Sequence, residues 1–229
     1  MKRIFSPSNC WFKDVYCQEP EENCNHGCQL FCNMKRLVDN SGLPYKLKTA
    51  NKLQCPEQDE EAYLQLNEIK KNIVDFVENG NNLYIYSNNV GNGKTTWASK
   101  LMMAYFACIA DNGHTISEVH GKFIDTVEFL KLGTDFTQSE GYYKLYRQLC
   151  EADLVIFDDV AVYEVTLPEA KALYTVVNKR ISNGLSTIFT SNRDVESLTN
   201  VVGGRIASRI WEASTTIELK ASSMRGLEL

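Results

Sequence analysis

A short loop in the first half of the chain has the residue types that bind phosphate groups. It follows an apolar run that ends at Tyr86, and it contains Gly91 and Gly93 just before a lysine and a threonine. Glycine lets backbone N–H groups approach an anion without a Cβ in the way, and the helix expected next points its positive end at the anion. Lys94 would contact the β- and γ-phosphates of a nucleoside triphosphate, and the Thr95 hydroxyl would bind Mg²⁺. The residues predicted to line this site are Asn89, Val90, Gly91, Asn92, Gly93, Lys94, Thr95 and Thr96.

The loop departs from the usual pattern at its first position. The pattern G-x-x-x-x-G-K-[ST] has a glycine where this chain has Asn88. Asparagine enters the left-handed backbone region more readily than other residues that carry a side chain, so we expect Asn88 to preserve the turn in this way. The alternative is an ordinary strand-to-helix turn with a surface lysine. The amphipathic run 97–110 after the loop favours the phosphate site.

A second apolar run carries two carboxylates at its end. Residues 154–157 are Leu, Val, Ile and Phe, and Asp158 and Asp159 follow directly. In a parallel sheet such a strand is buried on both faces, and its C-terminal tip lies where α/β proteins place their chemistry. Asp158 would hold Mg²⁺, directly or through water, and Asp159 would polarise an attacking water. The pattern is common by chance, and it becomes specific here because it follows a phosphate loop in the same domain.

Three further side chains are candidates for the same reaction. Residues 186–192 form another predicted strand with a polar tip, from which Asn192 would reach the water or the γ-phosphate. Arg205 and Arg209 lie four residues apart on one face of a short predicted helix. Their mutual repulsion gives an isolated helix no benefit, whereas an anion shared with a neighbouring subunit would explain the pair. A solvated basic patch is the alternative.

Strands and helices alternate along the chain at the spacing of a parallel sheet covered by helices on both faces. Besides the elements above, strands are predicted over 122–126 and 215–220, and helices over 28–38, 66–77, 127–132, 142–150 and 168–182. The tyrosines and leucines of 142–150 are expected in the core. His114 and His120 lie in polar connecting sequence without a partner at ligand spacing, so both are expected at the surface.

Composition limits the kinds of partner. The 229 residues carry a net charge of −5, which argues against a protein that grips nucleic acid through a broad basic surface. The longest apolar run, 101–110, is too short to span a bilayer, and the N-terminus lacks the apolar segment of a signal peptide. We therefore expect a cytoplasmic protein with no membrane contact.

Cysteines are concentrated near the N-terminus, where six of the eight precede residue 56. Four of them could form a structural Zn²⁺ site, with one histidine and one more cysteine as spare ligands. These candidates are Cys10, Cys17, Cys24 and Cys28, followed by His26 and Cys32. Because this segment is short and polar, it buries little apolar surface, and metal ligation would supply the free energy for its folding. The alternative is a loosely folded leader with free thiols. We predict a cysteine-rich module over 1–44, a linker over 45–60 and the main domain over 61–229.

Taken in this order, the motifs resemble those of the AAA+ ATPases, and within them the DnaC/DnaI-type replicative helicase loaders, especially the short versions of phages and prophages from Gram-positive bacteria. The resemblance rests on Cys10-Trp11-Phe12-Lys13, residues 82–96, Asp158-Asp159, Thr190-Ser191-Asn192 and Arg205-x-x-Ser208-Arg209. It implies a three-layer α/β sandwich with a parallel central sheet. It also implies that Arg209 acts in trans as an arginine finger on ATP held by the adjacent subunit and that Arg205 assists. Arg225 would belong to a sensor-2 region.

The same resemblance implies a function. It indicates an ATPase that loads a DnaB-type hexameric helicase, with the cysteine-rich module on the helicase and ATP-bridged self-assembly between copies. Contact with single-stranded DNA follows from the resemblance alone, because no basic, aromatic-rich stripe demands it. Asp159 stands where many AAA+ proteins have glutamate, and its shorter arm fits a slow switch better than a fast motor. An IstB-like transposition helper and a helicase-binding adaptor or inhibitor with little hydrolysis are the alternatives.

Overall fold

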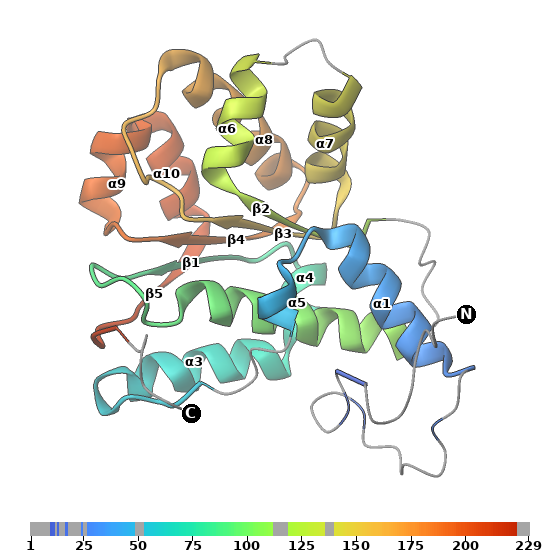
Figure 1. Ribbon diagram of the computed structural model, residues 1–229. Coiled ribbons are helices and arrows are strands. Elements are labelled where there is room, and N and C mark those ends of the chain that lie inside the picture. Colours follow the sequence, from blue (N-terminus) through green and yellow to red (C-terminus); the bar gives the residue numbers. More distant parts are fainter. Residues whose placement is uncertain are drawn as a thin grey trace.

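The computed structural model describes residues 10, 11, 13, 17, 24, 27–48, 53–111, 119–135 and 140–223, and Figure 1 shows how their helices and strands are arranged. At their centre lies a sheet with the strand order β2-β3-β4-β1-β5, in which every neighbouring pair is parallel. The strands are β1 (Asn82–Tyr86), β2 (Gly121–Asp125), β3 (Leu154–Asp158), β4 (Ser186–Ser191) and β5 (Ser214–Glu218). The predicted parallel sheet is thereby confirmed.

Strands β3, β4 and β1 occupy the middle of the sheet, and their residues are almost all buried, as expected of parallel strands covered on both faces. The register places Leu83 of β1 beside Ile188 of β4 and Thr215 of β5. At the carboxyl end of the strands, Asp125 of β2 lies beside Asp158 of β3. Because the strands are parallel, the polar residues that end them gather at one edge of the sheet.

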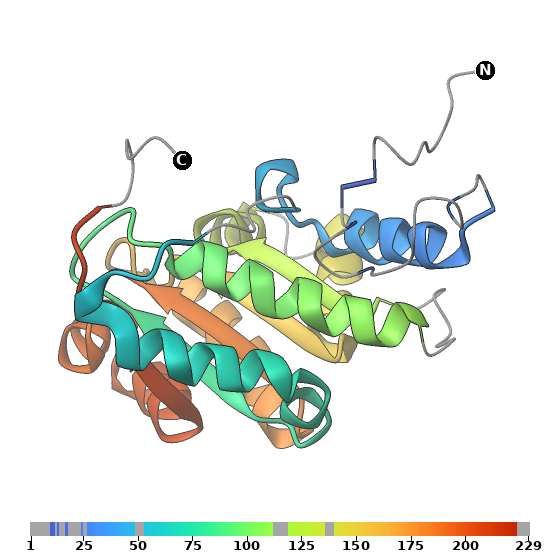
Figure 2. The ribbon, with the colours of Figure 1, turned by 90° about the horizontal axis from the view of Figure 1, so that it is seen from below.

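One face of the sheet is covered by α5 (Lys94–Asp111), with α1 (Gln29–Ser41) and α3 (Glu60–Lys71) on either side of it, as Figure 2 shows. Helix α5 is apolar around most of its circumference because it lies between the sheet and these two helices. Its buried side chains include Trp97, Ala98, Leu101, Met102 and Phe106. The short helix α4 (Ile73–Glu78) adds to this layer. Although α5 is long and apolar, no helix of the described residues could span a membrane.

The other face carries α6 (Thr126–Asp135), α7 (Glu140–Glu151), α8 (Leu167–Ser182), α9 (Val195–Val202) and α10 (Gly204–Glu212) (Figure 1). Aromatic rings form part of its core. Phe157 and Phe189 stack with their centroids 5.8 Å apart, and Phe129 meets Phe157 edge-on. Helix α8 begins within one residue of its predicted start, with a capping box between Thr166 and Glu169. Helices therefore cover both faces of the sheet, as predicted.

Helix α1 packs against α5 and shares its buried cluster. It begins after Cys28, whose sulfur accepts a hydrogen bond from the Phe31 N–H, and it ends before Gly42, which has a φ of 76°. The predicted helix is confirmed and extends three residues further. The helix α2 (Tyr45–Lys48) and the 3-10 turn η3 (Glu57–Asp59) follow. The domain boundaries expected near residues 44 and 60 stay a prediction.

The expectation that the tyrosines of α7 belong to the core is wrong for Tyr143, whereas Tyr142 and Tyr146 pack against the core cluster of this layer. Tyr143 is 57% exposed. Tyr142 and Tyr146 are half-buried and stack on each other with their centroids 6.3 Å apart. Of the leucines, Leu149 is buried and Leu145 half-buried. Helix α7 packs on α8, with Leu149 and Cys150 buried in its last turn, and Tyr143 is the tyrosine that faces outward.

His120 also differs from its expected surface position. Its Nδ1 lies 2.7 Å from Oδ2 of Asp153, which also accepts a hydrogen bond from the Tyr105 hydroxyl. Parallel pairing of β2 with β3 causes this, because it brings the residues that precede the two strands side by side. Burial opposes ionisation of Asp153, but the hydrogen bonds from His120 and Tyr105 outweigh it and lower the pKa of the carboxyl. His114 lies outside the described residues.

Arg180 of α8 is a fully buried charge that the sequence did not reveal. Its guanidinium donates to the carbonyl oxygens of Leu149, Ala152 and Ser186. Burial lowers its pKa to about 9. The side chain joins the end of α7 to the residues before β3 and the start of β4, so it holds this part of the second layer on the sheet.

Candidate nucleotide-binding site

The predicted phosphate loop connects β1 to α5 at the carboxyl edge of the sheet. Helix α5 begins at Lys94, so the loop occupies residues 87–93. Gly91 and Gly93 have φ values of 77° and 98°, a region that side chains disfavour. Asn88 does not adopt a positive φ: in the described part of the chain, the non-glycine residues that do are Asp159 and Ala161. The expectation of a left-handed Asn88 is wrong, because this turn does not use that conformation at its first position.

Lys94 is 5% exposed, and its ammonium group lies inside the loop. Its Nζ donates to the carbonyl oxygen of Asn89 across 2.9 Å and to Oδ1 of Asn92 across 3.1 Å. Both acceptors are neutral amide oxygens. Phosphate oxygens could replace them, because a hydrogen bond between two ions is stronger than one to a neutral amide. The loop, Lys94 and the N-terminus of α5 therefore fit a polyphosphate.

Asp158 accepts two hydroxyl hydrogen bonds at the tip of β3. Its Oδ1 lies 2.8 Å from the Thr95 hydroxyl and 2.6 Å from the Thr190 hydroxyl. Burial raises the pKa of the Asp158 carboxyl; the two hydrogen bonds oppose this, and the nearby charges of Asp159 and Asp125 add to it. A divalent cation would offset this crowding of negative charge, and hydroxyl and carboxylate oxygens are ligands that Mg²⁺ accepts. Thr95 and Asp158 therefore fit the predicted Mg²⁺.

Asp159 follows β3 in a left-handed backbone conformation, with a φ of 54°. Contacts to β4 hold it there: its N–H donates to the Thr190 hydroxyl across 2.9 Å, and the Val160 N–H donates to the Thr190 carbonyl across 2.8 Å. Such a conformation costs a non-glycine residue about 1–2 kcal/mol and marks places where structure constrains a side chain for use. Oδ1 of Asp159 lies 3.4 Å from Nδ2 of Asn192. The fold thus brings together the two residues that were predicted to handle the attacking water.

Two threonines that were not among the predicted site residues help to build the site. Thr190 contacts both aspartates, and the Thr126 hydroxyl donates to the Asp158 carbonyl across 2.7 Å. Both threonines stand at strand ends, and that position was a usable signal. Asn89 and Asn92 were predicted to line the site, and their side chains also donate to backbone carbonyls of 219–221. No sequence pattern marks these contacts.

Arg205 and Arg209 extend from the outer side of α10, away from the buried Ile206 and Ile210. Both arginines are exposed, and within the described residues neither guanidinium forms an ion pair or a hydrogen bond. They therefore do not join the loop and the aspartates of their own chain. Two cations without a carboxylate partner among the described residues remain available to an anion on another molecule. Arg225 lies outside the described residues.

The cysteines predicted to bind Zn²⁺ are not gathered into a site in the part of the chain that the structure describes. Cys10, Cys17 and Cys28 pack against the cluster of α1 and α5, and Cys28 also caps α1. Among the described residues, no three side chains of His, Cys, Asp and Glu lie close enough together to hold a metal ion. His26 lies outside them. The zinc module stays a prediction.

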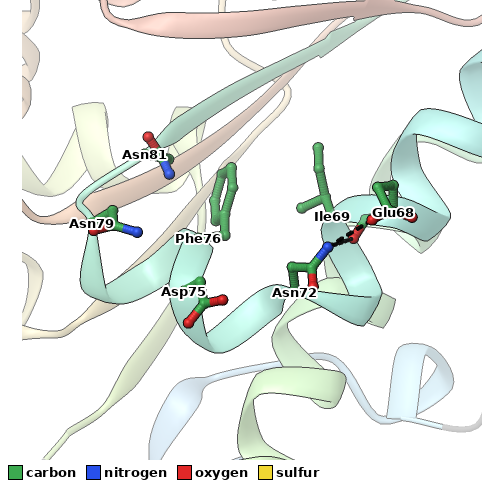
Figure 3. Close-up of a pocket in the computed structure, with 7 residues that line it drawn as sticks. All are labelled: Glu68, Ile69, Asn72, Asp75, Phe76, Asn79 and Asn81. Carbon is green, nitrogen blue, oxygen red and sulfur yellow. Dashed lines mark hydrogen bonds between the residues drawn. The ribbon is translucent and has the colours of Figure 1, made fainter.

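A shallow pocket lies away from this site (Figure 3). It is lined by Glu68, Ile69, Asn72, Asp75, Phe76, Asn79 and Asn81. Among its lining residues, Nδ2 of Asn72 donates to Oε1 of Glu68 across 2.8 Å and to the Glu68 carbonyl across 3.2 Å. Asn81 precedes β1 whereas the phosphate loop follows β1, so the pocket lies toward the opposite edge of the sheet. None of the predicted site residues lines it.

The sheet order, the phosphate loop after β1, the aspartate pair after β3 and the polar tip of β4 give this chain the AAA+ fold, and the family match below makes it an ATP-binding protein of that fold. This is the class that the sequence motifs resembled. Within it, the chain belongs to the IstB-like ATP binding protein family, whose sequence model matches residues 33–227.

Solved structures with the same fold include helicase loaders and replication initiators. The DnaC helicase loader matches with a TM-score of 0.60 and 16% identity, over 77% of this chain and 100% of that chain. DnaI matches with a TM-score of 0.60 and 18% identity, over 78% of this chain and 95% of that chain. The initiator DnaA bound to AMPPCP and single-stranded DNA matches with a TM-score of 0.61 and 19% identity, over 80% of this chain and 52% of that chain. At these identities the likeness establishes the shared fold.

A curated relative from Escherichia coli (strain K12), the uncharacterized protein YdaV, is 27% identical over 140 residues. The matched part covers 61% of this chain and 53% of YdaV. This chain therefore spans about half the length of that relative.

Proposed function

We propose that this protein is an ATP-dependent loader of a DnaB-type hexameric replicative helicase. The observation that carries the proposal is the extent of the structural match, which covers the whole DnaC helicase loader chain and 95% of DnaI but only 52% of DnaA. A chain that matches nearly all of a loader's structure has the same elements available for the same task. The ATP-dependent part rests on the site geometry.

The geometry supports ATP binding followed by slow hydrolysis. The loop N–H groups and Lys94 hold the triphosphate, and Mg²⁺ bound by Thr95 and Asp158 would neutralise charge on it. Asp159 and Asn192 orient a water, whose oxygen bonds to the γ-phosphorus as the bond to the β–γ bridging oxygen breaks, giving ADP and phosphate. Aspartate reaches less far than glutamate, so Asp159 would lie farther from the water and hydrolysis would be slow. In this proposal ATP binding is therefore the signal, and hydrolysis ends that signal.

A second copy completes the site in this proposal. Arg209, assisted by Arg205, reaches ATP on the adjacent copy, where a cation stabilises the charge that develops during transfer. The exposure of both arginines and their lack of partners among the described residues support this role. Arg225 contacts the nucleotide. The N-terminal segment, stabilised by Zn²⁺, docks on the helicase, and single-stranded DNA is a further ligand.

Co-purification with the hexameric helicase of the same organism tests the loader proposal. The full chain should form a defined complex, and a variant that lacks residues 1–27 should not. Helix α1 is kept in this variant because Phe31, Met34 and Leu37 are buried in the core. The helicase should unwind DNA faster when the full chain is added. Slower unwinding would indicate an inhibitor, and a complex unaffected by the truncation would refute N-terminal docking.

A transposition helper ATPase is the second candidate, and the family match over residues 33–227 favours it. Such a helper would use the same ATP site but would bind a transposase. Parallel pull-downs with the helicase and with the transposase encoded nearest the gene separate the two candidates. ATP turnover with and without single-stranded DNA should be measured on the same preparations, because an adaptor with little hydrolysis would show no turnover in either.

A further inference from the structure

The carboxylate of Asp59 binds a segment that lies 161 residues away in the chain. Its Oδ1 accepts a hydrogen bond from the Lys220 N–H across 2.6 Å, and both carboxylate oxygens accept from the Ala221 N–H, across 3.2 Å and 3.3 Å. Asp59 is 2% exposed. It occupies the N-cap position of α3, yet its side chain makes no capping hydrogen bond to that helix. An aspartate at this position usually caps its own helix, so its contact with a distant segment requires another explanation.

The phosphate loop holds the other side of the same segment, which we call the clamped segment (219–221). Asn89 donates from Nδ2 to the carbonyls of its last two residues, across 3.0 Å and 3.2 Å. Asn92 donates from Nδ2 to the carbonyl of Leu219 across 3.1 Å. Asp59 thus binds N–H groups of the clamped segment, and the loop binds its carbonyl groups.

Asn92 connects the clamped segment to the phosphate-binding lysine. It is fully buried, and its Nδ2 also donates to the Ser87 hydroxyl. Its Oδ1 accepts a hydrogen bond from Nζ of Lys94. An amide held by its nitrogen on both Ser87 and the clamped segment can present its oxygen in only one direction. That direction sets where the Lys94 ammonium lies before nucleotide binds.

We propose that Asp59 is a positioning residue for nucleotide binding. Its carboxylate fixes the clamped segment, the clamped segment orients Asn89 and Asn92, and these two residues shape the loop and place Lys94 for the phosphates. The inference rests on the proposed use of ATP at this loop, and it adds a residue outside the loop that sets the affinity. It also connects η3 and the start of α3 to the phosphate site.

Two substitutions of Asp59 in the full-length protein separate this role from a merely structural one. Asp59→Ala leaves the buried Ala221 N–H and the part-buried Lys220 N–H without their acceptor. Asp59→Asn keeps a side-chain oxygen that can accept from one of them. Glu57→Gln is the matched control, because Glu57 is an exposed carboxylate two residues earlier in the same turn. Affinity is measured with a fluorescent, non-hydrolysable ATP analogue, and circular dichroism shows that each variant is folded at the temperature used.

Asp59→Ala should weaken binding of the analogue by about tenfold or more, the effect of one good hydrogen bond to a charged group. Asp59→Asn should recover most of this loss, and Glu57→Gln should bind like the wild type. In combination with Asn92→Ala, Asp59→Ala should add little further loss of affinity, because both substitutions break the same connection. A folded Asp59→Ala variant that binds the analogue as tightly as the wild type would overturn the proposal, as would full additivity of the two losses.

Hydrogen exchange gives a second readout that works even if Asp59→Ala does not fold. In the wild type and in Asp59→Asn, the analogue should slow exchange of the Lys220 and Ala221 amides, because coupling between two sites is reciprocal. Unchanged exchange in a wild type that binds the analogue would overturn the positioning role and leave the ATP site intact. A wild type that does not bind the analogue at all would overturn the proposed function and the positioning role together.

Discussion

The Thr95 hydroxyl donates a hydrogen bond to the Asp158 carboxylate across 2.8 Å, although 63 positions separate the two residues in the chain. Thr95 lies in the first turn of α5, and Asp158 ends β3. Helix α5 follows β1, and only one strand, β4, lies between β1 and β3. The parallel sheet therefore brings the two groups predicted to share Mg²⁺ into direct contact, beside the lysine predicted to bind phosphate.

Asp158→Asn should stabilise the nucleotide-free protein at neutral pH, in the absence of Mg²⁺. Burial raises the pKa of this carboxyl above its ordinary value of 3.8, so the folded state holds the proton more tightly than the unfolded state. The wild type therefore loses stability as pH rises from about 3.8 through the raised pKa, and the substitution removes that loss. Urea unfolding at a series of pH values should show an advantage for Asp158→Asn at neutral pH that shrinks toward about pH 4. An advantage that grew with acidity would contradict this explanation.

Asn88→Gly should leave nucleotide affinity within about twofold of the wild type, because Asn88 does not use a positive φ. Gly91 has a φ of 77°, so Gly91→Ala should weaken affinity by about tenfold, the equivalent of a 1–2 kcal/mol backbone cost. Titration with a fluorescent ATP analogue measures both. A large gain in affinity from Asn88→Gly would show that the asparagine strains the loop after all.

Arg180→Met should lower the free energy of unfolding by about 1–3 kcal/mol, the cost of leaving buried acceptors unsatisfied, although Arg180 is far from the nucleotide site. The substitution leaves the buried carbonyls of Leu149 and Ala152 without their donor. Lys179→Met removes an exposed charge from the neighbouring position and should change stability by less than about 0.5 kcal/mol. Urea denaturation of both variants gives the comparison. Equal effects would mean that the guanidinium is not needed to hold this layer.

Lys94→Ala should abolish nucleotide binding, whereas Arg209→Ala should bind ATP normally in isolated monomers and hydrolyse it more slowly when assembled. Lys94 lies inside the loop, but Arg209 is exposed on α10 and contacts none of the loop residues described. Equilibrium binding at concentrations too low for assembly tests the first part, and turnover at high concentration tests the second. If Arg209→Ala weakened monomer binding as much as Lys94→Ala, the arginine would act within its own chain.

The strands, their parallel direction and the edge that carries the chemistry could be predicted because each rests on a pattern in the sequence, whereas the order of the strands in the sheet was not predicted. The apolar run 154–157 ending in two aspartates marks a buried strand and its functional tip within six residues. The glycines of the loop are equally local, since backbone conformation alone demands them. Such local patterns can be recognised in the sequence without knowledge of the tertiary structure.

Long-range polar contacts could not be predicted in the same way. Asp59 stands in an acidic run that resembles a solvated linker, and its partners are backbone N–H groups near the other end of the chain. His120 and Asp153 meet only because β2 pairs with β3. Tyr142, Tyr143 and Tyr146 lie in one amphipathic segment, but Tyr143 points to the surface while the other two pack against the core cluster. In each case the position of the side chain depends on a residue that is distant in the sequence and close only in the folded structure.

ATP turnover by mixed variants tests the shared site most directly. Lys94→Ala lacks a working loop but keeps its arginines, and Arg209→Ala keeps the loop but lacks the arginine. Lys94→Ala alone should be inactive and Arg209→Ala alone should turn over ATP much more slowly than the wild type, whereas an equal mixture should regain turnover at about one quarter of its junctions, where an intact loop meets an intact arginine. Recovered turnover would establish that Arg209 acts on ATP held by another copy. A mixture no more active than the separate variants, under conditions in which the wild type assembles and hydrolyses ATP, would contradict it.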